Sequence, residues 1–132
     1  MLDHVGIPVS DYTRSKGFYL RVLKTLGFDL VLEVASQETG GNSFAGFGSK
    51  GRPQFWIGGG RPIRGSVHFA FMAKTRAAVR AFHKAALEAG GKDNGAPGLR
   101  PHYHENYYGA FVLDPDGHNI EAVCHLAEAP GS

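Results

Sequence analysis

Apolar residues alternate with other residues near the start of the chain, and this pattern predicts a β-strand. The apolar positions between residues 5 and 9 share one parity and would point to one face, which places His4 on the opposite face. Asp11 is a good N-cap for the next segment, where apolar residues recur at helical spacing as far as Gly27. Three further strands are expected after this helix, at residues 28–34, 44–47 and 54–57.

The second half of the chain follows the same plan. A strand is predicted over residues 66–73, and the helix that Thr75 would cap is expected to stop at Gly90. Glycine and proline recur over residues 93–98, which we expect to form a loop. Two more strands, at 107–113 and 119–125, flank the predicted turn Asp114–Gly117.

A shift of 64 residues, the separation of His4 and His68, superimposes the two halves. The shift also places Phe18 on Phe82, Leu23 on Leu87 and Gly27 on Gly91. We therefore expect an α+β fold of two βαβββ modules that form a curved mixed sheet around a shared cavity. In a single domain over residues 1–132, module one would span about 2–58 and the linker 59–65. Module two would span about 66–125 and the tail 126–132.

Composition narrows the class of protein. The chain has 132 residues, of which 42% are hydrophobic and 20% charged, with a formal net charge of +2. These values are typical of a globular protein, and no basic stretch is long enough to indicate nucleic-acid binding. No apolar run approaches the roughly 20 residues that span a bilayer. The single cysteine, Cys124, excludes an internal disulfide and is compatible with a cytoplasmic location.

Strand parity also brings candidate metal ligands together. Side chains along a strand point alternately to its two faces. His4 in the first strand, His68 in the fifth and Glu121 in the last each lie on the face opposite to the apolar, helix-covered residues of the same strand. Two imidazoles and one carboxylate with open positions suit a divalent ion such as iron, zinc, manganese or nickel. Glu121 is also a candidate catalytic residue. His118 lies in the preceding turn and is expected to be solvated.

Other residues are predicted to contact a substrate in the same cavity. Trp56 and Phe111 would supply apolar walls, and Tyr107 would supply a polar contact or donate a proton in catalysis. His102 and His104 would line the cavity mouth, and the alternative is that they form a histidine pair in a loop.

The two modules, their strand-borne histidines and the segment Asp114–Glu121 (DPDGHNIE) resemble the vicinal-oxygen-chelate superfamily over roughly residues 2–125. This superfamily includes glyoxalase I, extradiol dioxygenases and bleomycin-resistance proteins. By this resemblance His4, His68 and Glu121 match the family's metal ligands, and the protein is expected to form a homodimer. Some members use a fourth ligand on the fourth strand. Here Trp56 is opposite Glu121 in the repeat, and Gln54 has the parity to serve instead.

The leading functional hypothesis is a metal-dependent enzyme acting on a small oxygenated substrate that is chelated to the ion. A lactoylglutathione-lyase-like lyase or isomerase and an extradiol-type dioxygenase both fit, whereas thiol transfer ranks lower because no cationic cluster lies near Asn119. The alternative is a non-catalytic, antibiotic-binding protein of the bleomycin-resistance type. The net charge of +2 counts against a cationic drug as its cargo.

Overall fold

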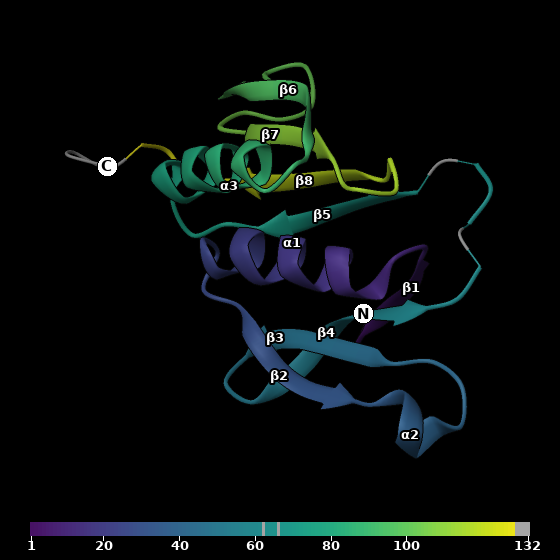
Figure 1. Ribbon diagram of the computed structural model, residues 1–132. Helices are drawn as coiled ribbons and strands as arrows, with labels where there is room; N and C mark the ends of the chain where they lie inside the picture. The colour runs from purple at the N-terminus through teal and green to yellow at the C-terminus, as the bar shows by residue number, and fades with distance from the viewer. Residues whose placement is uncertain (62, 66, 129–132) are drawn as a thin grey trace.

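A computed structural model describes residues 1–61, 63–65 and 67–128, and it divides the chain into two similar modules. In each, a long helix lies against a four-stranded sheet (Figure 1). Module one contains β1 (Val5–Val9), α1 (Tyr12–Lys24), β2 (Asp29–Val34), the short helix α2 (Ser36–Thr39), β3 (Phe44–Ser49) and β4 (Arg52–Gly59). Module two contains β5 (His68–Met72), α3 (Arg76–Glu88), β6 (Lys92–Leu99), β7 (Tyr108–Leu113) and β8 (Asn119–Cys124).

The two sheets have the same topology. Their strand orders are β1-β4-β3-β2 and β5-β8-β7-β6, and in each sheet the first two strands of that order are parallel. Gly6 pairs with Trp56 in the first sheet, and Ala70 pairs with Glu121 in the second. Because Gly6 and Ala70 are 64 residues apart, Trp56 and Glu121 occupy equivalent positions. The predicted α+β fold of two βαβββ modules is confirmed.

The prediction of a loop over residues 93–98 is wrong, because these residues belong to β6. This strand pairs with β7 through register shifts between Asp93 and Gly95 and between Gly95 and Gly98. Glycine-rich strands with bulges lack the regular alternation by which strands are recognised in a sequence. Residues 62, 66 and 129–132 of the predicted linker, second module and tail lie outside the described residues.

Both long helices begin at the predicted capping residues. The Asp11 side chain accepts a hydrogen bond from the Arg14 backbone N–H, and Thr75 accepts one from Ala78 in the same way. Such caps satisfy backbone donors that have no partner within the helix. Each helix has 13 residues, and none of the helices in the described part of the chain has the length and apolar character needed to cross a membrane.

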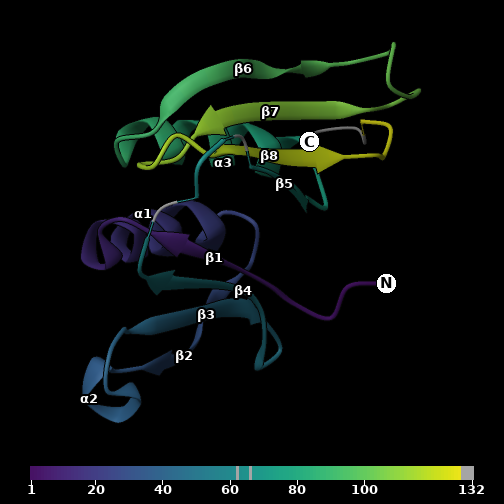
Figure 2. The same cartoon turned by 90° about the vertical axis from the view of Figure 1, so that its right-hand side faces the viewer.

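The apolar faces of the two sheets and of both long helices form one core. The Phe55 ring on β4 lies 5.7 Å from the Phe69 ring and 5.2 Å from the Phe71 ring, both on β5. Figure 2 shows β5 and β8 facing β1 and β4 across the boundary between the modules. The modules are therefore packed against each other through shared aromatic contacts.

The turn before β8 also joins the modules. The buried Tyr19 hydroxyl on α1 donates a 2.5 Å hydrogen bond to Asp114, whose other carboxylate oxygen accepts from the backbone N–H groups of Asp116 and His118. Asp116 in turn accepts a hydrogen bond from the Ser10 backbone, just before α1. The expectation that His118 is solvated is wrong, since it is 3% exposed. The turn is held against module one through Asp114 and Asp116, and His118 is buried within it.

Candidate functional site

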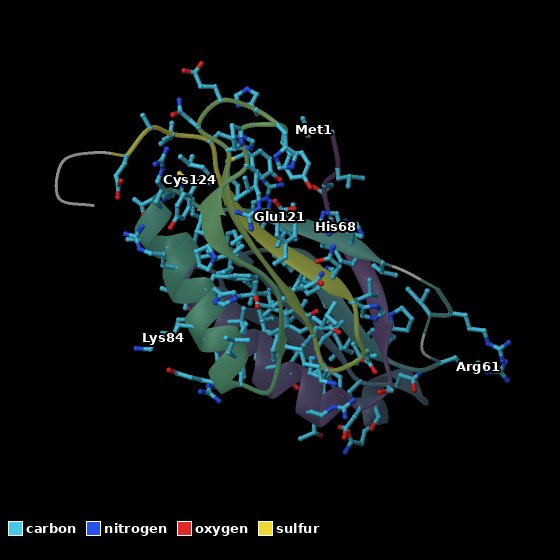
Figure 3. All side chains as sticks on the ribbon, turned by 90° about the horizontal axis from the view of Figure 1, so that it is seen from above. Met1, Arg61, His68, Lys84, Glu121 and Cys124 are labelled. Atoms are coloured by element: carbon cyan, nitrogen blue, oxygen red, sulfur yellow. The ribbon has the colours of Figure 1, made fainter. Side chains whose placement is uncertain are left out.

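Three predicted site residues meet on the face of the second sheet that points away from the helix. Glu121 on β8 is only 1% exposed, and its Oε1 lies 3.1 Å from His68 Nε2 on β5. The Tyr107 hydroxyl donates a hydrogen bond to the other oxygen, Oε2. Gly109 leaves room for this arrangement, since a Cβ atom there would lie 3.2 Å from the Tyr107 ring and 3.3 Å from Oε2. Figure 3 shows His68 and Glu121 next to each other.

The orientation of the His68 ring identifies the state of its two nitrogens. Nδ1 lies 3.0 Å from the Asn119 carbonyl oxygen, which can only accept a hydrogen bond, so Nδ1 carries a proton. In a neutral imidazole, Nε2 would then present a lone pair to the Glu121 carboxylate at 3.1 Å. Two acceptors at this distance need either a proton shared between them or a metal ion that both bind.

Tyr107 is a hydrogen-bond donor to Glu121 over a wide pH range. Partial burial and the neighbouring Glu121 carboxylate raise the pKa of the Tyr107 phenol well above its usual value. The phenol therefore keeps its proton and holds Oε2 of Glu121 in place through this hydrogen bond. Phe111 lies beside this group, with its ring 6.2 Å from the His68 ring and nearly parallel to it. Phe111 also pairs with Glu121 in the sheet register.

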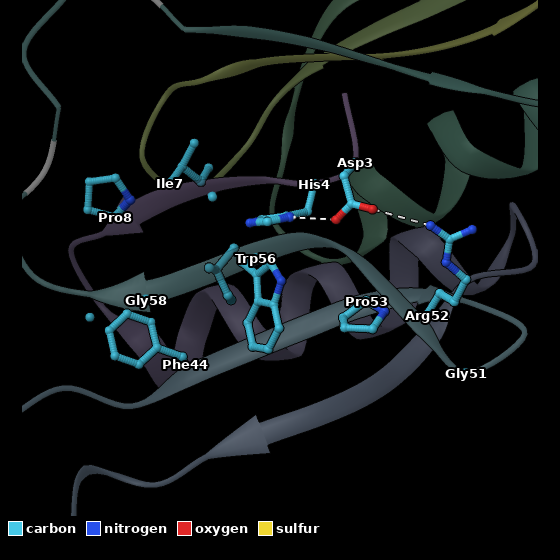
Figure 4. Close-up of a pocket in the computed structure, with 13 residues that line it drawn as sticks. Asp3, His4, Ile7, Pro8, Phe44, Gly51, Arg52, Pro53, Trp56 and Gly58 are labelled. Carbon is cyan, nitrogen blue, oxygen red and sulfur yellow. Dashed lines mark hydrogen bonds and ion pairs between the residues drawn. The ribbon is translucent and has the colours of Figure 1, made fainter. Parts of the chain in front are cut away.

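His4 directly precedes β1 of the first sheet and lies in a groove of about 740 Å³. All the residues that line this groove belong to module one, and Trp56 forms one of its walls (Figure 4). His4 Nδ1 lies 2.8 Å from an oxygen of Asp3, whose other oxygen lies 3.3 Å from the Arg52 guanidinium. Asp3 thus holds the His4 ring at Nδ1 and leaves Nε2 free to bind a ligand.

The structure brings His68 and Glu121 together, but it does not group His4 with them. Among the residues that the structure describes, no set of three or more His, Cys, Asp or Glu side chains is placed to hold a metal ion. A second cavity, of about 400 Å³, is lined by both modules and includes Gln54 and His68. The three-ligand site and the fourth ligand Gln54 therefore stay predictions.

His102 and His104 lie in the turn between β6 and β7. The His102 ring packs on Tyr103 at 4.2 Å, and Tyr103 packs on Tyr107 at 5.2 Å, so the turn is joined to the site through Tyr107. His104 packs on the exposed His125 ring at 5.6 Å. Their predicted contact with a substrate stays a prediction, as do those of Trp56 and Phe111.

Sequence reasoning missed two residues that contact candidate site residues. Asp3, next to His4 in the chain, orients its imidazole, and a carboxylate adjacent to a candidate ligand is the signal that could have found it. Arg100 lies over the Phe111 ring, with its guanidinium carbon 5.6 Å from the ring centre. It could not be placed while residues 93–98 were interpreted as a loop.

The family model of the glyoxalase/bleomycin resistance protein/dioxygenase superfamily matches residues 1–122. The chain belongs to this superfamily. The match covers both modules and ends just after Glu121, so it includes all three predicted ligands. A search among curated proteins found none that matches the chain.

Solved structures of this superfamily are similar to the chain. A glyoxalase/bleomycin resistance protein from Albidiferax ferrireducens is 28% identical, with a TM-score of 0.71, covering 94% of this chain and 98% of that one. A family enzyme from Burkholderia phytofirmans is 22% identical, with a TM-score of 0.63, over 94% and 98% of the two chains. Glyoxalase I from Zea mays is 22% identical, with a TM-score of 0.65, and the match covers 93% of this chain but 45% of the maize chain.

Proposed function

We propose that this protein is a divalent-metal-dependent enzyme that acts on a small oxygenated substrate, with His68 and Glu121 as two of its metal ligands. The observation that supports it most is the geometry of the His68 ring. Its Nδ1 is fixed by a carbonyl oxygen, and its Nε2 faces a buried carboxylate oxygen at 3.1 Å. Two atoms that bind one ion at about 2.0–2.2 Å each lie about 3 Å apart, and metal-bound histidines commonly use the other nitrogen for such a hydrogen bond.

We propose further that His4 is the third ligand and that it comes from a second copy of the chain. His4 lies in a groove lined only by module one, while His68 and Glu121 lie on module two. A two-fold assembly that sets the first sheet of one copy against the second sheet of the other would bring the three side chains together. It would form two such sites. This agrees with the homodimer expected from the family resemblance.

The ion, when bound, would polarise substrate oxygens at its open positions and lower the pKa of bound water. The chain's own residues would orient the substrate and move a proton. Glu121 is held by Tyr107, whose protonated phenol can donate its single hydrogen bond either to Oε2 or to a substrate oxygen. Trp56 and Phe111 would supply apolar contacts from the two facing sheets. This chemistry fits a glyoxalase-type isomerisation and an extradiol-type ring cleavage.

A non-catalytic binding protein is the second candidate, favoured by the groove beside Trp56. This groove is larger than the second cavity, and Phe44, Pro53 and Pro8 join Trp56 in lining it. Such an apolar surface could hold a small molecule without a metal ion. On this hypothesis Nε2 of His68 carries a proton and forms an ion pair with Glu121.

Metal analysis of the purified protein separates the two functions. We expect one zinc or ferrous ion per chain after anaerobic loading, and strongly reduced binding in the variants His4→Ala and Glu121→Ala. When the two variants are mixed and allowed to exchange subunits, a mixed dimer regains one complete site, so metal binding should return. A mixture that binds no more metal than its components would overturn the shared site. Wild-type protein that takes up no metal would overturn the enzyme and favour the binding protein.

A further inference from the structure

We propose that Arg100 is the anion-recognition residue of this site and that the substrate carries a carboxylate group that its guanidinium binds. This inference deepens the proposed function, on which it rests for the reaction. The binding contact itself is argued from the second sheet alone, so it can be tested without turnover.

Arg100 follows β6 directly and reaches back over the site face of the sheet. Its guanidinium carbon lies 5.6 Å from the centre of the Phe111 ring, and the Phe111 ring stacks on the His68 ring. Guanidinium, phenyl ring and imidazole therefore follow one another across the same face, next to Glu121. A small molecule seated at His68 and Glu121 would extend along Phe111 toward the guanidinium.

The guanidinium has hydrogen-bond donors to spare. Its Nη2 donates to the Ala96 carbonyl at 2.8 Å, and this is its one side-chain hydrogen bond within the described part of the chain. Across those same residues, no Asp or Glu oxygen lies within 4.0 Å of it. A planar guanidinium that is half-buried and without an anion can bind a carboxylate through two parallel hydrogen bonds.

Two glycines of β6 leave the space in which the guanidinium lies. A Cβ atom at Gly98 would lie 3.1 Å from Nη1 of Arg100, and one at Gly95 would lie 2.9 Å from the Phe111 ring and 3.4 Å from Nη2. A side chain at either position would crowd the Arg100 guanidinium or the Phe111 ring, which would have to shift. The glycine-rich character of β6, which hides this strand in the sequence, thus gives Arg100 its place beside the site.

The charge on this face also favours an anionic substrate. With a bound divalent ion, the single carboxylate of Glu121 would leave this face with an excess of positive charge. A substrate with one carboxylate would reduce that excess, and its apolar body would lie on Phe111. A neutral substrate would leave the half-buried guanidinium without a partner, which is unfavourable.

Benzoate and benzamide test this contact, because they have nearly the same shape and differ in charge. We would measure their binding by isothermal titration calorimetry, with and without added zinc. In wild-type protein benzoate should bind more tightly than benzamide. The variant Arg100→Gln should weaken benzoate binding by about tenfold to a hundredfold and leave benzamide binding unchanged, because it removes hydrogen bonds to a charged group. Arg100→Lys, which keeps the charge but not the two parallel donors, should lie between them.

Arg61→Gln is the matched control, since Arg61 is exposed and lies far from Glu121 and His68 (Figure 3). It removes the same charge and should leave the affinity for benzoate unchanged. Equal benzoate affinity in wild type and Arg100→Gln would overturn the inference, and so would an equal loss of benzoate and benzamide binding, which would indicate a structural role. Zinc uptake by Arg100→Gln should match the wild type. If wild-type protein takes up no zinc, the proposed function fails, while the comparison of benzoate with benzamide still tests Arg100.

Discussion

The two modules share a topology, yet they differ at the position where chemistry is expected. Trp56 and Glu121 are paired with the equivalent residues Gly6 and Ala70, so the same point of the two sheets carries an indole in one module and a carboxylate in the other. Both modules also place a histidine at the start of their first strand, at positions 4 and 68. The two modules therefore share a strand order. They differ at this position, where only the second sheet carries a carboxylate.

The two histidines differ in what holds them. His4 Nδ1 is next to the exposed Asp3 carboxylate, and His68 Nδ1 is next to the Asn119 backbone carbonyl. Their side chains are 60% and 49% exposed, respectively. Both arrangements leave Nε2 for a ligand, but only His68 has a buried carboxylate opposite it. Under the proposed function, module two would supply two metal ligands, and module one would supply one ligand and an apolar groove.

The largest expected effect comes from a substitution that breaks the aromatic contact between the modules. Phe55 and Ile120 are equivalent residues in the repeat, but Phe55 packs on Tyr19, Phe69 and Phe71 from both modules. We expect Phe55→Ala to lower the free energy of unfolding by about 3–5 kcal/mol, and Ile120→Val by about 0.5–1.5 kcal/mol. Urea unfolding followed by circular dichroism measures both. Similar losses in the two variants would contradict a core that depends on Phe55.

A second prediction concerns the hydrogen bond that crosses the module boundary. Tyr19→Phe leaves a buried oxygen of Asp114 without its donor, so we expect a loss of about 1–3 kcal/mol in the free energy of unfolding. Tyr12→Phe is the matched control within the same helix, because its hydroxyl bonds to the exposed Glu33 carboxylate and its removal should cost less than about 1 kcal/mol. Equal costs would mean that the turn at Asp114 does not hold the modules together.

Much of this frame could be predicted from the sequence. Alternation in β1, β5 and β8 separates helix-covered residues from the opposite face, and the structure confirms that Ile7, Val9, Ile120 and Ala122 are in the core. The same parity correctly placed Tyr107 and Phe111 on the face of Glu121. The alternation predicts the face of each side chain here because the two faces of each strand have different surroundings.

The remainder depended on contacts between segments that are far apart in the sequence. The burial of His118 follows from the docking of its turn on α1, which alternation within β8 does not encode. The bulges of β6 concealed the strand that carries Arg100 to the site. Whether His4 joins His68 and Glu121 depends on how whole sheets face each other, and strand parity cannot settle that. It specifies a face of each sheet and says nothing of the distance between two sheets.

A third prediction sharpens the difference between the two site faces. Tyr107→Phe removes the hydrogen bond that orients Glu121, so we expect zinc affinity to fall by about tenfold to a hundredfold, as for other residues that hold a metal ligand. Trp56→Phe, at the position equivalent to Glu121, should leave zinc affinity unchanged because it alters only an apolar wall. Competition with a chromophoric chelator measures both affinities. A larger loss for Trp56→Phe than for Tyr107→Phe would contradict the proposal that module two supplies two of the three metal ligands.

The smallest effect concerns the polar contacts that join each long helix to the far strand of its sheet. Lys16 on α1 lies 2.8 Å from Glu33 on β2, and His83 on α3 lies 2.9 Å from Asp93 on β6. Hydrogen bonds from Lys16 and Tyr12 lower the pKa of Glu33. In module two, hydrogen bonds from His83 and from the Gly95 backbone lower the pKa of Asp93. A carboxyl group whose pKa is lowered in the folded state stabilises the protein at pH values above its ordinary pKa. This contribution is lost as the pH falls through the lowered pKa.

We therefore expect Lys16→Met to raise the pKa of Glu33 toward its ordinary value, and His83→Gln to do the same for Asp93. Titration of the side-chain carboxyl carbons by NMR measures both values. Lys24→Met is the control, because Lys24 lies 4.0 Å from the exposed Asp29 and makes no contact with Glu33 among the described residues. The effect on stability should be small, since both carboxylates, Glu33 and Asp93, are exposed to water. If the pKa of Glu33 stays low without Lys16, the Tyr12 hydroxyl holds that carboxylate, and the two modules use different groups for the same connection.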